Sequence, residues 1–574
     1  MKHHIPFTAI ALLLAAHVTF AAAYSDLDMM VSEPAIPADS VPHVVSLSGN
    51  VYTGSYLYGA NGIDPHRSPF SGYIGGNLNL SIYKFNIPFS FILSEQERSF
   101  QQPFNQFGLS PKYKWLTLHG GYRNLSWSDY TLGGHTFLGG GIELTPGKFR
   151  FGAMYGKFTR ATQTDTIDNF ISTPAFDRYG YTVKLGVGSS TNYVDLIVLH
   201  AKDDPSSIPY DTSSYLVTPA ENLVAGIRSV QKIGKHFQWD GECAFSIYTD
   251  DAAVTDAIFE NSKELLALQN AVKDIITVNA STGYHSALQS SFGYTNTNFS
   301  AKIQYKRIGP EYNSMGTYFL MNDIQNITLQ PSFKLWKRKV IGSGSIGMQQ
   351  DNLSGAKGVT SRHVIGSALL QVNPKPHYGV SFNYTNYSTG QKAALMELND
   401  TTRIALVSQN FSIVPRYTYQ MKKMVHTAVL VYSLQTLQDK NIFTSDLTSY
   451  NTNNINATYS LTYLPWAGGA TLSYNQNTVT GSTITTAFSG VSIGANKSFL
   501  KNTLSTSATL LFNGTKVNNV SSGNITNINI GAGYQLHKKH RFSANITRIQ
   551  FNSSSAAVSS YDETTAHIAY TFIF

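Results

Sequence analysis

The stretch Asn454–Tyr463, NINATYSLTY, alternates apolar residues with small polar residues along its whole length. A second stretch, Asn527–Leu536, NINIGAGYQL, repeats the pattern. A period of two residues is typical of a β-strand, in which successive side chains point to opposite faces of the sheet. Such segments recur along the chain and predict strands with one apolar face and one polar face.

A large soluble β-sandwich or propeller also contains alternating strands. The segments here run to about ten or more residues, longer than the five or six that are usual in soluble sheets. Their polar phase is mostly Asn, Thr, Ser and Gly, where a soluble surface would carry Lys and Glu. Both features favour strands whose apolar face is in a membrane.

The composition supports the same conclusion. Only 13% of the 574 residues are charged, whereas 12% are aromatic. A soluble chain of this length needs more surface charge, and a disordered chain would not contain so many aromatic residues. The single cysteine, Cys243, permits no intramolecular disulfide. The net charge of +8 comes without the clustered Lys and Arg that nucleic-acid binding needs, so no nucleic-acid partner is expected.

Residues 1–23 are predicted to be a signal peptide, with an apolar run at Ile10–Ala16 and a cleavage site of small residues at Ala21–Ala23. No later run of about 18 apolar residues could form a spanning helix. We therefore expect a short periplasmic segment over residues 24–43. Residues 44–574 are predicted to form a transmembrane antiparallel β-barrel, surrounded by lipid of the cell outer membrane of a Gram-negative bacterium.

The chain stops on an alternating strand in which Ile568, Tyr570, Phe572 and Phe574 share the apolar phase. A terminal Phe in that phase resembles the C-terminal signature that the bacterial barrel-assembly machinery reads. The resemblance implies that this machinery is a partner, contacted through Phe574.

Tight connections recur about every 40 residues and alternate with longer polar links, which is the bacterial pattern of short periplasmic turns and longer outer loops. Eleven tight turns join eleven strand pairs, and a first and a last strand bring the predicted total to about 24, within a range of 22 to 26. The predicted tight turns are Tyr83–Asn86, Pro146–Lys148, Ser189–Asn192, Ile233–His236, Thr295–Asn298, Lys337–Lys339, Asn373–Pro376, Met421–Met424, Leu464–Gly468, Phe499–Asn502 and His537–His540.

Two segments do not fit the simple alternation of turns and loops. Residues 96–134 are favoured as an insertion in the lumen or at its mouth, because they are rich in Gly and aromatic residues and contain Pro. The alternative is two further strands, which would make 26. Residues 251–279 have apolar residues at helical spacing, which predicts either a helix capping an outer loop or a helix that enters the lumen as a gate.

Several motifs resemble large outer-membrane barrel proteins of Bacteroidota, most of which have no assigned activity. The resemblance implies the fold and the localisation, and it supplies no site residues. The motifs are Pro103–Trp115, Tyr130–Phe137, Pro146–Phe151, Arg307–Tyr312 and Gln350–Leu353.

No enzymatic chemistry is expected. The chain has neither a G-x-S-x-G motif nor a metal-spaced histidine cluster, so we predict no catalytic residue, cofactor or metal site. His119 and His135 lie in or beside the unusual segment but form no motif. The acidic pairs Asp203-Asp204 and Asp250-Asp251 could bind calcium, although solvated loop carboxylates are the favoured interpretation. A receptor with a separate plug domain is excluded because alternation begins by Val45.

Charged residues in the inward phase of neighbouring strands are candidate lumenal residues. They form either a salt-bridge network that stiffens the wall or a surface that contacts the insertions or a passing solute. The C-terminal half has mostly Asn, Thr, Ser and Gly in the same phase. The candidates are Glu143, Arg150, Lys184, Asp195, Arg228, Asp240 and Glu242.

Basic residues gather in the predicted periplasmic turns. They either solubilise the turns or form a positive ring for anionic lipid headgroups or an acidic periplasmic partner. We call the densest part of this set the basic rim. The basic rim consists of Lys337, Arg338, Lys339, Lys422, Lys423, Lys538 and Lys539.

A barrel of this size without a plug domain has a lumen too wide for side chains alone to fill. The sequence therefore favours an outer-membrane channel or export barrel for a polar or macromolecular solute, gated by its insertions or by a partner. The alternative is a non-conducting barrel that anchors surface or periplasmic proteins.

Overall fold

The computed structural model describes residues 45–95, 106–162, 174–208, 217–254, 270–318, 320–356, 359–393, 405–439, 445–555 and 558–574. The predicted signal peptide and the segment 24–43 lie outside these residues. The chain divides into two units, residues 1–46 and 47–574, and the second unit forms the barrel.

Long strands make up almost all of the described residues. Their bounds are β1 (Val45–Asn61), β2 (Phe70–Ile82), β3 (Phe85–Ser94), β4 (Gln106–Leu109), β5 (Lys112–Tyr113), β6 (Leu116–Ser126), β7 (Gly133–Leu144), β8 (Phe149–Thr159), β9 (Asp177–Gly188), β10 (Tyr193–Asp204), β11 (Glu221–Ile233), β12 (Phe237–Thr249), β13 (Thr282–Thr295), β14 (Phe299–Ile308), β15 (Ile324–Leu335), β16 (Val340–Gln350), β17 (Val359–Lys375), β18 (Tyr378–Ala393), β19 (Ala405–Gln420), β20 (Met424–Asp439), β21 (Tyr450–Tyr463), β22 (Gly468–Gly481), β23 (Thr485–Phe499), β24 (Leu504–Val517), β25 (Val520–Leu536), β26 (His540–Ser553) and β27 (Tyr561–Ile573).

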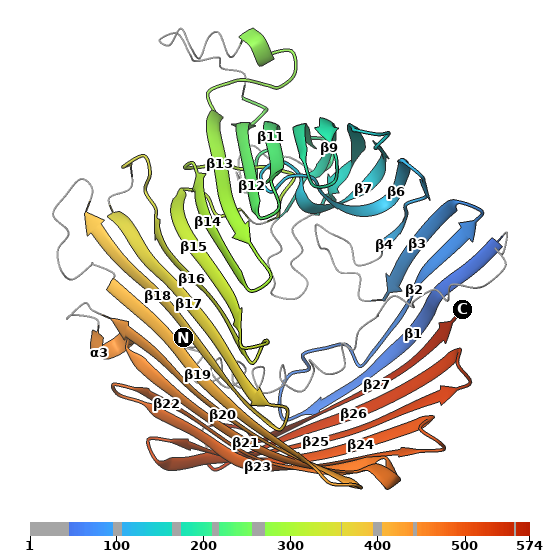
Figure 1. Ribbon diagram of the computed structural model, residues 1–574, viewed down its shortest axis with the longest axis vertical. Coiled ribbons are helices and arrows are strands. Elements are labelled where there is room, and N and C mark those ends of the chain that lie inside the picture. The colour runs from blue at the N-terminus through green and yellow to red at the C-terminus, as the bar shows by residue number, and fades with distance from the viewer. Residues whose placement is uncertain are drawn as a thin grey trace. The chain divides into compact units, whose positions relative to one another are not determined.

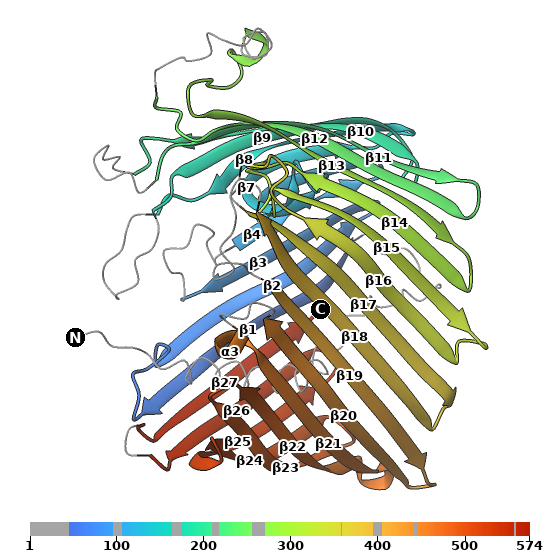
Figure 2. The ribbon, with the colours of Figure 1, turned by 90° about the vertical axis from the view of Figure 1, so that its left-hand side faces the viewer.

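The strands form one closed antiparallel barrel (Figures 1 and 2). β27 pairs with β1, from Asn50 opposite Ile573 to Asn61 opposite Asp562. β4 and β5 share one place between β3 and β6, so the barrel has 26 strands. Closure pairs the backbone groups that an open sheet edge would leave exposed, which a bilayer requires. The predicted all-β transmembrane barrel is confirmed.

The total of 26 lies within the predicted range and corresponds to the alternative of two further strands. Residues 106–126 form β4, β5 and β6 in the wall, so the favoured insertion over 96–134 is wrong for this part. The sequence analysis did not predict the tight turn between β5 and β6. This turn lies between Tyr113 and Leu116, which are paired across the two strands. Lys114 takes the left-handed conformation there, with φ 49°, although Gly or Asn is the usual residue.

All the turns that the sequence predicts as tight lie at one end of the strands, as does the turn between β5 and β6, and most connections at the other end are longer. Two connections at that other end are also short. β24 and β25 are joined by Asn518 and Asn519, which have φ values of 49° and 65° and form the type of hairpin turn that asparagine favours. β22 and β23 are joined by residues 482–484.

Apolar side chains face outward. Leu472, Ile493, Ile530, Ile546 and Ile568 are 48% to 58% exposed, although all lie in the middle of paired strands. Large aliphatic side chains exposed to this extent form the lipid-facing band of a membrane barrel. The short helical elements include α3 (Ser445–Thr448) and the 3₁₀ turn Leu464–Trp466, and residues 270–272 are also helical. Across the described ranges, no helix is long and apolar enough to cross a membrane.

The second predicted insertion, residues 251–279, is described only at its two ends, and residues 255–269 lie outside the described residues. Its two described ends are fastened together because Asn279 Nδ2 donates to the carbonyl oxygens of Asp251 and Val254. The predicted helix, as a cap or as a gate, stays a prediction.

Candidate functional site: a plug on a charged wall

Two connections that are far apart in the sequence fold against the inner face of the barrel. Residues 127–132 join β6 to β7, and residues 312–317 belong to the connection between β14 and β15. Tyr130, Leu132 and Tyr312 are at most 1% exposed. We call these two segments together the plug.

The plug makes an apolar core with inward side chains of the wall. The wall contributes residues from β7 to β15, and this cluster is the main buried core of the described residues. Its wall members are Phe137, Met154, Phe158, Ile197, Leu199, Ala201, Val224, Ala244, Ala287, Ile308 and Ile324. Burying this apolar surface favours the plug in its observed place.

Hydrogen bonds join the two halves of the plug. Tyr312 Oη donates to the carbonyl oxygen of Tyr130 at 2.9 Å, and Ser314 Oγ donates to that of Thr131 at 2.7 Å. The Gly133 amide donates to the Gly316 carbonyl oxygen at 2.9 Å. A side chain at Gly316 would meet the Thr131 carbonyl oxygen, so the close approach of the two segments needs glycine there.

Further hydrogen bonds fasten the plug to the wall. Ser128 Oγ and the Tyr130 amide both donate to Glu242 Oε1 on β12. The Met315 amide donates to Asn222 Oδ1 on β11 at 3.0 Å, and Asn222 is completely buried. Burial raises the pKa of Tyr130 and Tyr312, with a smaller contribution from the Glu242 carboxylate, so both phenols stay protonated as donors.

Glu242 ends a row of charges that crosses five strands. Arg150 makes two hydrogen bonds to Asp195, of 2.7 and 2.8 Å. Arg228 stands opposite both Asp195 and Glu242 in the strand register and lies 3.5 Å from the Glu242 carboxylate. Gly186 lies between Arg150 and Asp195 on β9, and its missing side chain lets the guanidinium reach across that strand.

In a second row of charges, a glycine again lies between two oppositely charged residues. Lys184 Nζ reaches Glu143 at 2.9 Å across Gly152, which separates their two strands. The Lys184 ammonium also lies 4.4 Å from the centre of the Trp127 ring, where cation–π attraction holds the plug. His119 then contacts Glu143 at 3.2 Å.

All seven predicted lumenal charges belong to these two rows. Asp240, the remaining member, lies 3.9 Å from Arg228. The predicted lumenal insertion 96–134 contains the first half of the plug, residues 127–132, but sequence reasoning missed residues 312–317, Asn222 and the two spacer glycines. The glycines are the only signal that could have found the arrangement, because they stand in the inward phase between residues of opposite charge.

The two histidines and Asp203, which the sequence analysis also considered, contact neighbouring side chains. His135 stacks on Tyr318 at 4.1 Å between ring centres, and His119 Nδ1 contacts Ser110 Oγ at 2.9 Å. Asp203 makes two hydrogen bonds with Arg178. Within the described part of the chain, no three His, Cys, Asp or Glu side chains are grouped to hold a metal ion.

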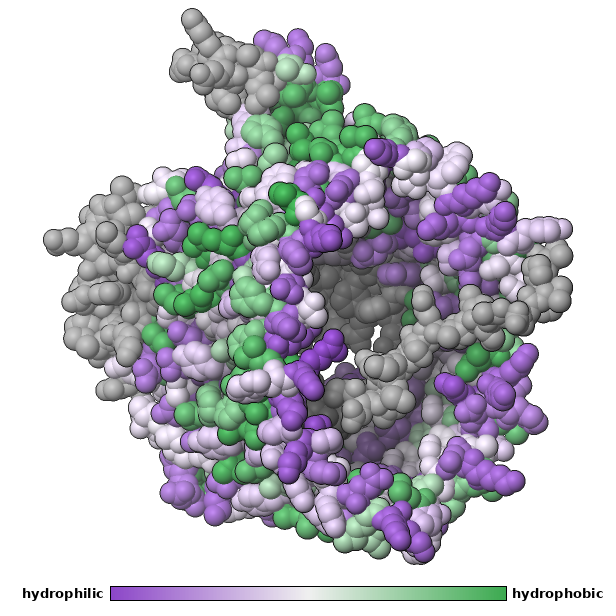
Figure 3. Space-filling model, viewed as in Figure 1, coloured by the Kyte–Doolittle hydropathy of each residue, from purple (hydrophilic) through white to green (hydrophobic). Residues whose placement is uncertain are grey.

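The opposite wall differs in chemistry. On β21 and β22 the inward side chains are hydroxyls and amides that bond to each other, as Thr458 does to Ser473 at 3.0 Å and Ser460 to Thr471 at 3.3 Å. Figure 3 shows the barrel hollowed at one end, with hydrophilic residues along much of the edge of the opening. The lumen therefore has a charged, plug-bearing wall on one side and a neutral wall on the other.

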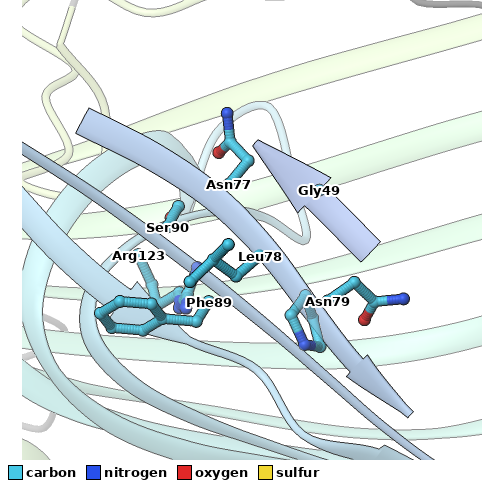
Figure 4. A pocket seen from close by; sticks show the side chains of 8 residues that line it. Gly49, Asn77, Leu78, Asn79, Phe89, Ser90 and Arg123 are labelled. Carbon is cyan, nitrogen blue, oxygen red and sulfur yellow. The ribbon is translucent and has the colours of Figure 1, made fainter. Parts of the chain in front are cut away.

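A small cavity of about 270 Å³ lies apart from the plug, on strands β1, β2, β3 and β6 (Figure 4). Arg123 reaches it from β6, and its Nε donates to the Leu109 carbonyl oxygen at 3.1 Å. Its Nη2 is buried and has no hydrogen-bond partner among the described residues. The cavity is lined by Gly49, Asn77, Leu78, Asn79, Pro88, Phe89, Ser90 and Arg123.

No protein-family model and no curated protein matches the chain. Among solved structures, it is similar to OccAB4 of Acinetobacter baumannii, at 11% identity over 70% of this chain and 99% of that chain, with a TM-score of 0.30. It is similar to the translocation pore of the P pilus usher PapC, at 11% identity over 92% and 99%, with a TM-score of 0.35. It is also similar to a mutant ferric enterobactin receptor, PfeA, of Pseudomonas aeruginosa, at 9% identity over 91% and 80%, with a TM-score of 0.40.

These similarities assign no activity and no residue role to this chain. The closed ladder and the apolar outer face identify the chain as a large β-barrel of the kind found in Gram-negative outer membranes.

Proposed function

We propose that the protein is a transport barrel for a polar or macromolecular solute, and that the plug is its gate. The observation that carries this proposal is a closed barrel of 26 strands with a plug that, among the described residues, is fastened to one side of the wall, mainly to β7–β15. Barrels of 16 to 18 strands already leave an aqueous channel. Once the plug has left its wall, the solute would pass along the neutral C-terminal wall.

The plug is held by non-covalent contacts, which suit a gate that has to open. It is tied to the wall by an apolar core, by hydrogen bonds to Glu242 and Asn222, and by the Lys184 contact with Trp127. Its halves are connections rather than wall strands, so they can leave the wall without breaking the barrel ladder. Removing residues 96–134 as a whole would instead delete three wall elements.

Conductance of the purified protein in planar bilayers tests the proposal. The variant Ser128→Ala, Glu242→Gln, Ser314→Ala loosens the plug without touching the barrel ladder, and it should raise conductance well above that of the native protein. Asp240→Asn is the matched control, because Asp240 lies on the same strand without bonding to the plug. Absence of conductance in both the native protein and the loosened variant would contradict the proposal.

One observation favours a different function. The plug residues Thr131 and Leu132 are completely buried, as a permanent closure would require. A barrel closed in this way could anchor surface or periplasmic proteins without conducting. The native protein separates the two functions in the same bilayer measurement, since a gate opens in the native protein whereas a permanent closure does not conduct until its plug is loosened.

A further inference from the structure

The two ends of the barrel have opposite charge. Every tight turn is free of Asp and Glu, and all of these turns lie within the described residues. The basic rim lies in three of them, between β15 and β16, between β19 and β20, and between β25 and β26. The connections at the other end contain acidic residues such as Asp250, Asp251 and Glu311.

The basic side chains are available to a ligand. All seven residues of the basic rim are exposed, and none of them makes an ion pair in the part of the chain that the structure describes. The lumenal cations Arg150, Lys184 and Arg228, by contrast, are all paired. Unpaired cations in the turns repel one another, so an external anion would relieve the repulsion.

The positive charge continues around the circumference. Lys84, Lys148, Lys235, Lys375 and Lys501 lie in or beside other tight turns, from β2–β3 to β23–β24. A protein partner of ordinary size would need the charge gathered in one patch, because each partner buries only about 800 Å². A ring of charge fits a ligand that surrounds the barrel.

Aromatic side chains fix the depth of this ring in the bilayer. Tyr83, Trp336 and Trp466 lie in tight turns at this same end of the barrel and are 78%, 73% and 67% exposed. Exposed Trp and Tyr mark the level of the lipid headgroups. Lys497 Nζ lies 5.3 Å from the Trp466 ring centre, so basic and aromatic groups meet at one level.

We propose that the basic rim and the other turn lysines bind the phosphate groups of anionic phospholipids in the leaflet at the tight-turn end. Each lysine or arginine near an anionic lipid surface contributes about 1 kcal/mol of attraction, which corresponds to a preference of about fivefold. The attraction decays over about 8 Å at physiological salt, so it acts only on headgroups next to the protein.

Quenching of tryptophan fluorescence by brominated lipids can measure which lipid lies next to the tight turns. Phosphatidylcholine vesicles containing full-length protein receive either brominated phosphatidylglycerol or brominated phosphatidylcholine, and bromine quenches the fluorescence of tryptophans that it contacts. Trp115, Trp336 and Trp466 all lie in tight turns. The native protein should show at least about fivefold stronger quenching by the anionic lipid, and the preference should disappear in high salt.

The variant with all seven residues of the basic rim changed to Gln should lose the preference. A matched variant with the six lysines of the rim changed to Arg keeps the charge and should behave like the native protein. Heat-modifiable mobility establishes that each variant is folded, and if the Gln variant fails to fold, Lys337→Gln, Arg338→Gln, Lys339→Gln beside Trp336 replaces it. Equal quenching by the two lipids in the native protein, or a preference that survives the Gln changes, would overturn the proposal. Salt-sensitive capture of an acidic protein without any lipid preference would also overturn it.

Discussion

At the scale of single residues, two glycines decide whether charges on the inner wall can meet. Gly152 and Gly186 each stand between two oppositely charged residues that lie on the strands to either side. Charged pairs that are two strands apart would normally be separated by a side chain. The glycines therefore turn isolated lumenal charges into the rows that support the plug.

Replacing Gly186 by Val should break the contact between Arg150 and Asp195, because the valine Cβ would meet the Asp195 carboxylate. Asp195 is 2% exposed, and an unpaired buried charge costs about 3 kcal/mol. The denaturant midpoint of the refolded barrel should fall accordingly. Gly59→Val is the control, since nothing lies within 4 Å of its added Cβ. Equal losses in both variants would mean that the glycine spacer has no special role.

Asn222 has the same importance for the second half of the plug. Its side chain is fully buried and bonds to Met315, Ser246 and Ile247. Asn222→Ala removes those bonds and leaves a buried amide unsatisfied, at a cost of about 1 to 3 kcal/mol. Hydrogen exchange at residues 312–317 should accelerate by one to two orders of magnitude. Asn529→Ala, on the opposite wall, should leave that exchange unchanged, and acceleration in both variants would contradict this role.

At the scale of elements, alternation predicted most of the wall from the sequence, because lipid on one side and water on the other impose a period of two. It failed at β4, β5 and β6. Pro111 interrupts the strand there, and the turn after it contains Lys114 and Trp115 rather than Gly or Asn. Residues 127–132 of the plug lie within the predicted lumenal insertion, but the second half, residues 312–317, comes from a connection about 180 residues away, and no pattern in the sequence joins the two.

The turn between β5 and β6 provides a test of whether these strands belong to the barrel wall. Lys114 has φ 49°, a conformation that costs a residue with a Cβ about 1 kcal/mol and costs Gly nothing. Lys114→Gly should therefore raise the unfolding midpoint of the barrel. Lys112→Gly, in strand β5 beside it, should lower the midpoint because Gly weakens a strand. Identical effects of the two substitutions would argue against a tight turn at this place.

At the scale of the whole molecule, the barrel is asymmetric both around its circumference and between its ends. Tight turns at one end and mostly longer connections at the other predict that the tight turns face the periplasm. A cysteine replacing Arg338 or Lys423, in a Cys243→Ser background, should resist membrane-impermeant labelling in intact cells. A cysteine replacing Ser206 or Ser555 should react. Labelling at the tight turns of intact cells would reverse the orientation.

If the plug is the gate of the barrel, it must leave the wall before the barrel conducts. Thr131 on the plug and Gly226 on β11 are adjacent, because a Cβ at Gly226 would lie 2.8 Å from Thr131 Oγ1. The double variant Thr131→Cys, Gly226→Cys, in a Cys243→Ser background, can thus lock the plug by a disulfide. The most direct measurement is the conductance of this protein in a planar bilayer before and after reduction. We predict a closed barrel when the protein is oxidised and openings to large conductance after reduction, with no such change in Cys243→Ser alone. Equal conductance in the oxidised and reduced states would contradict it.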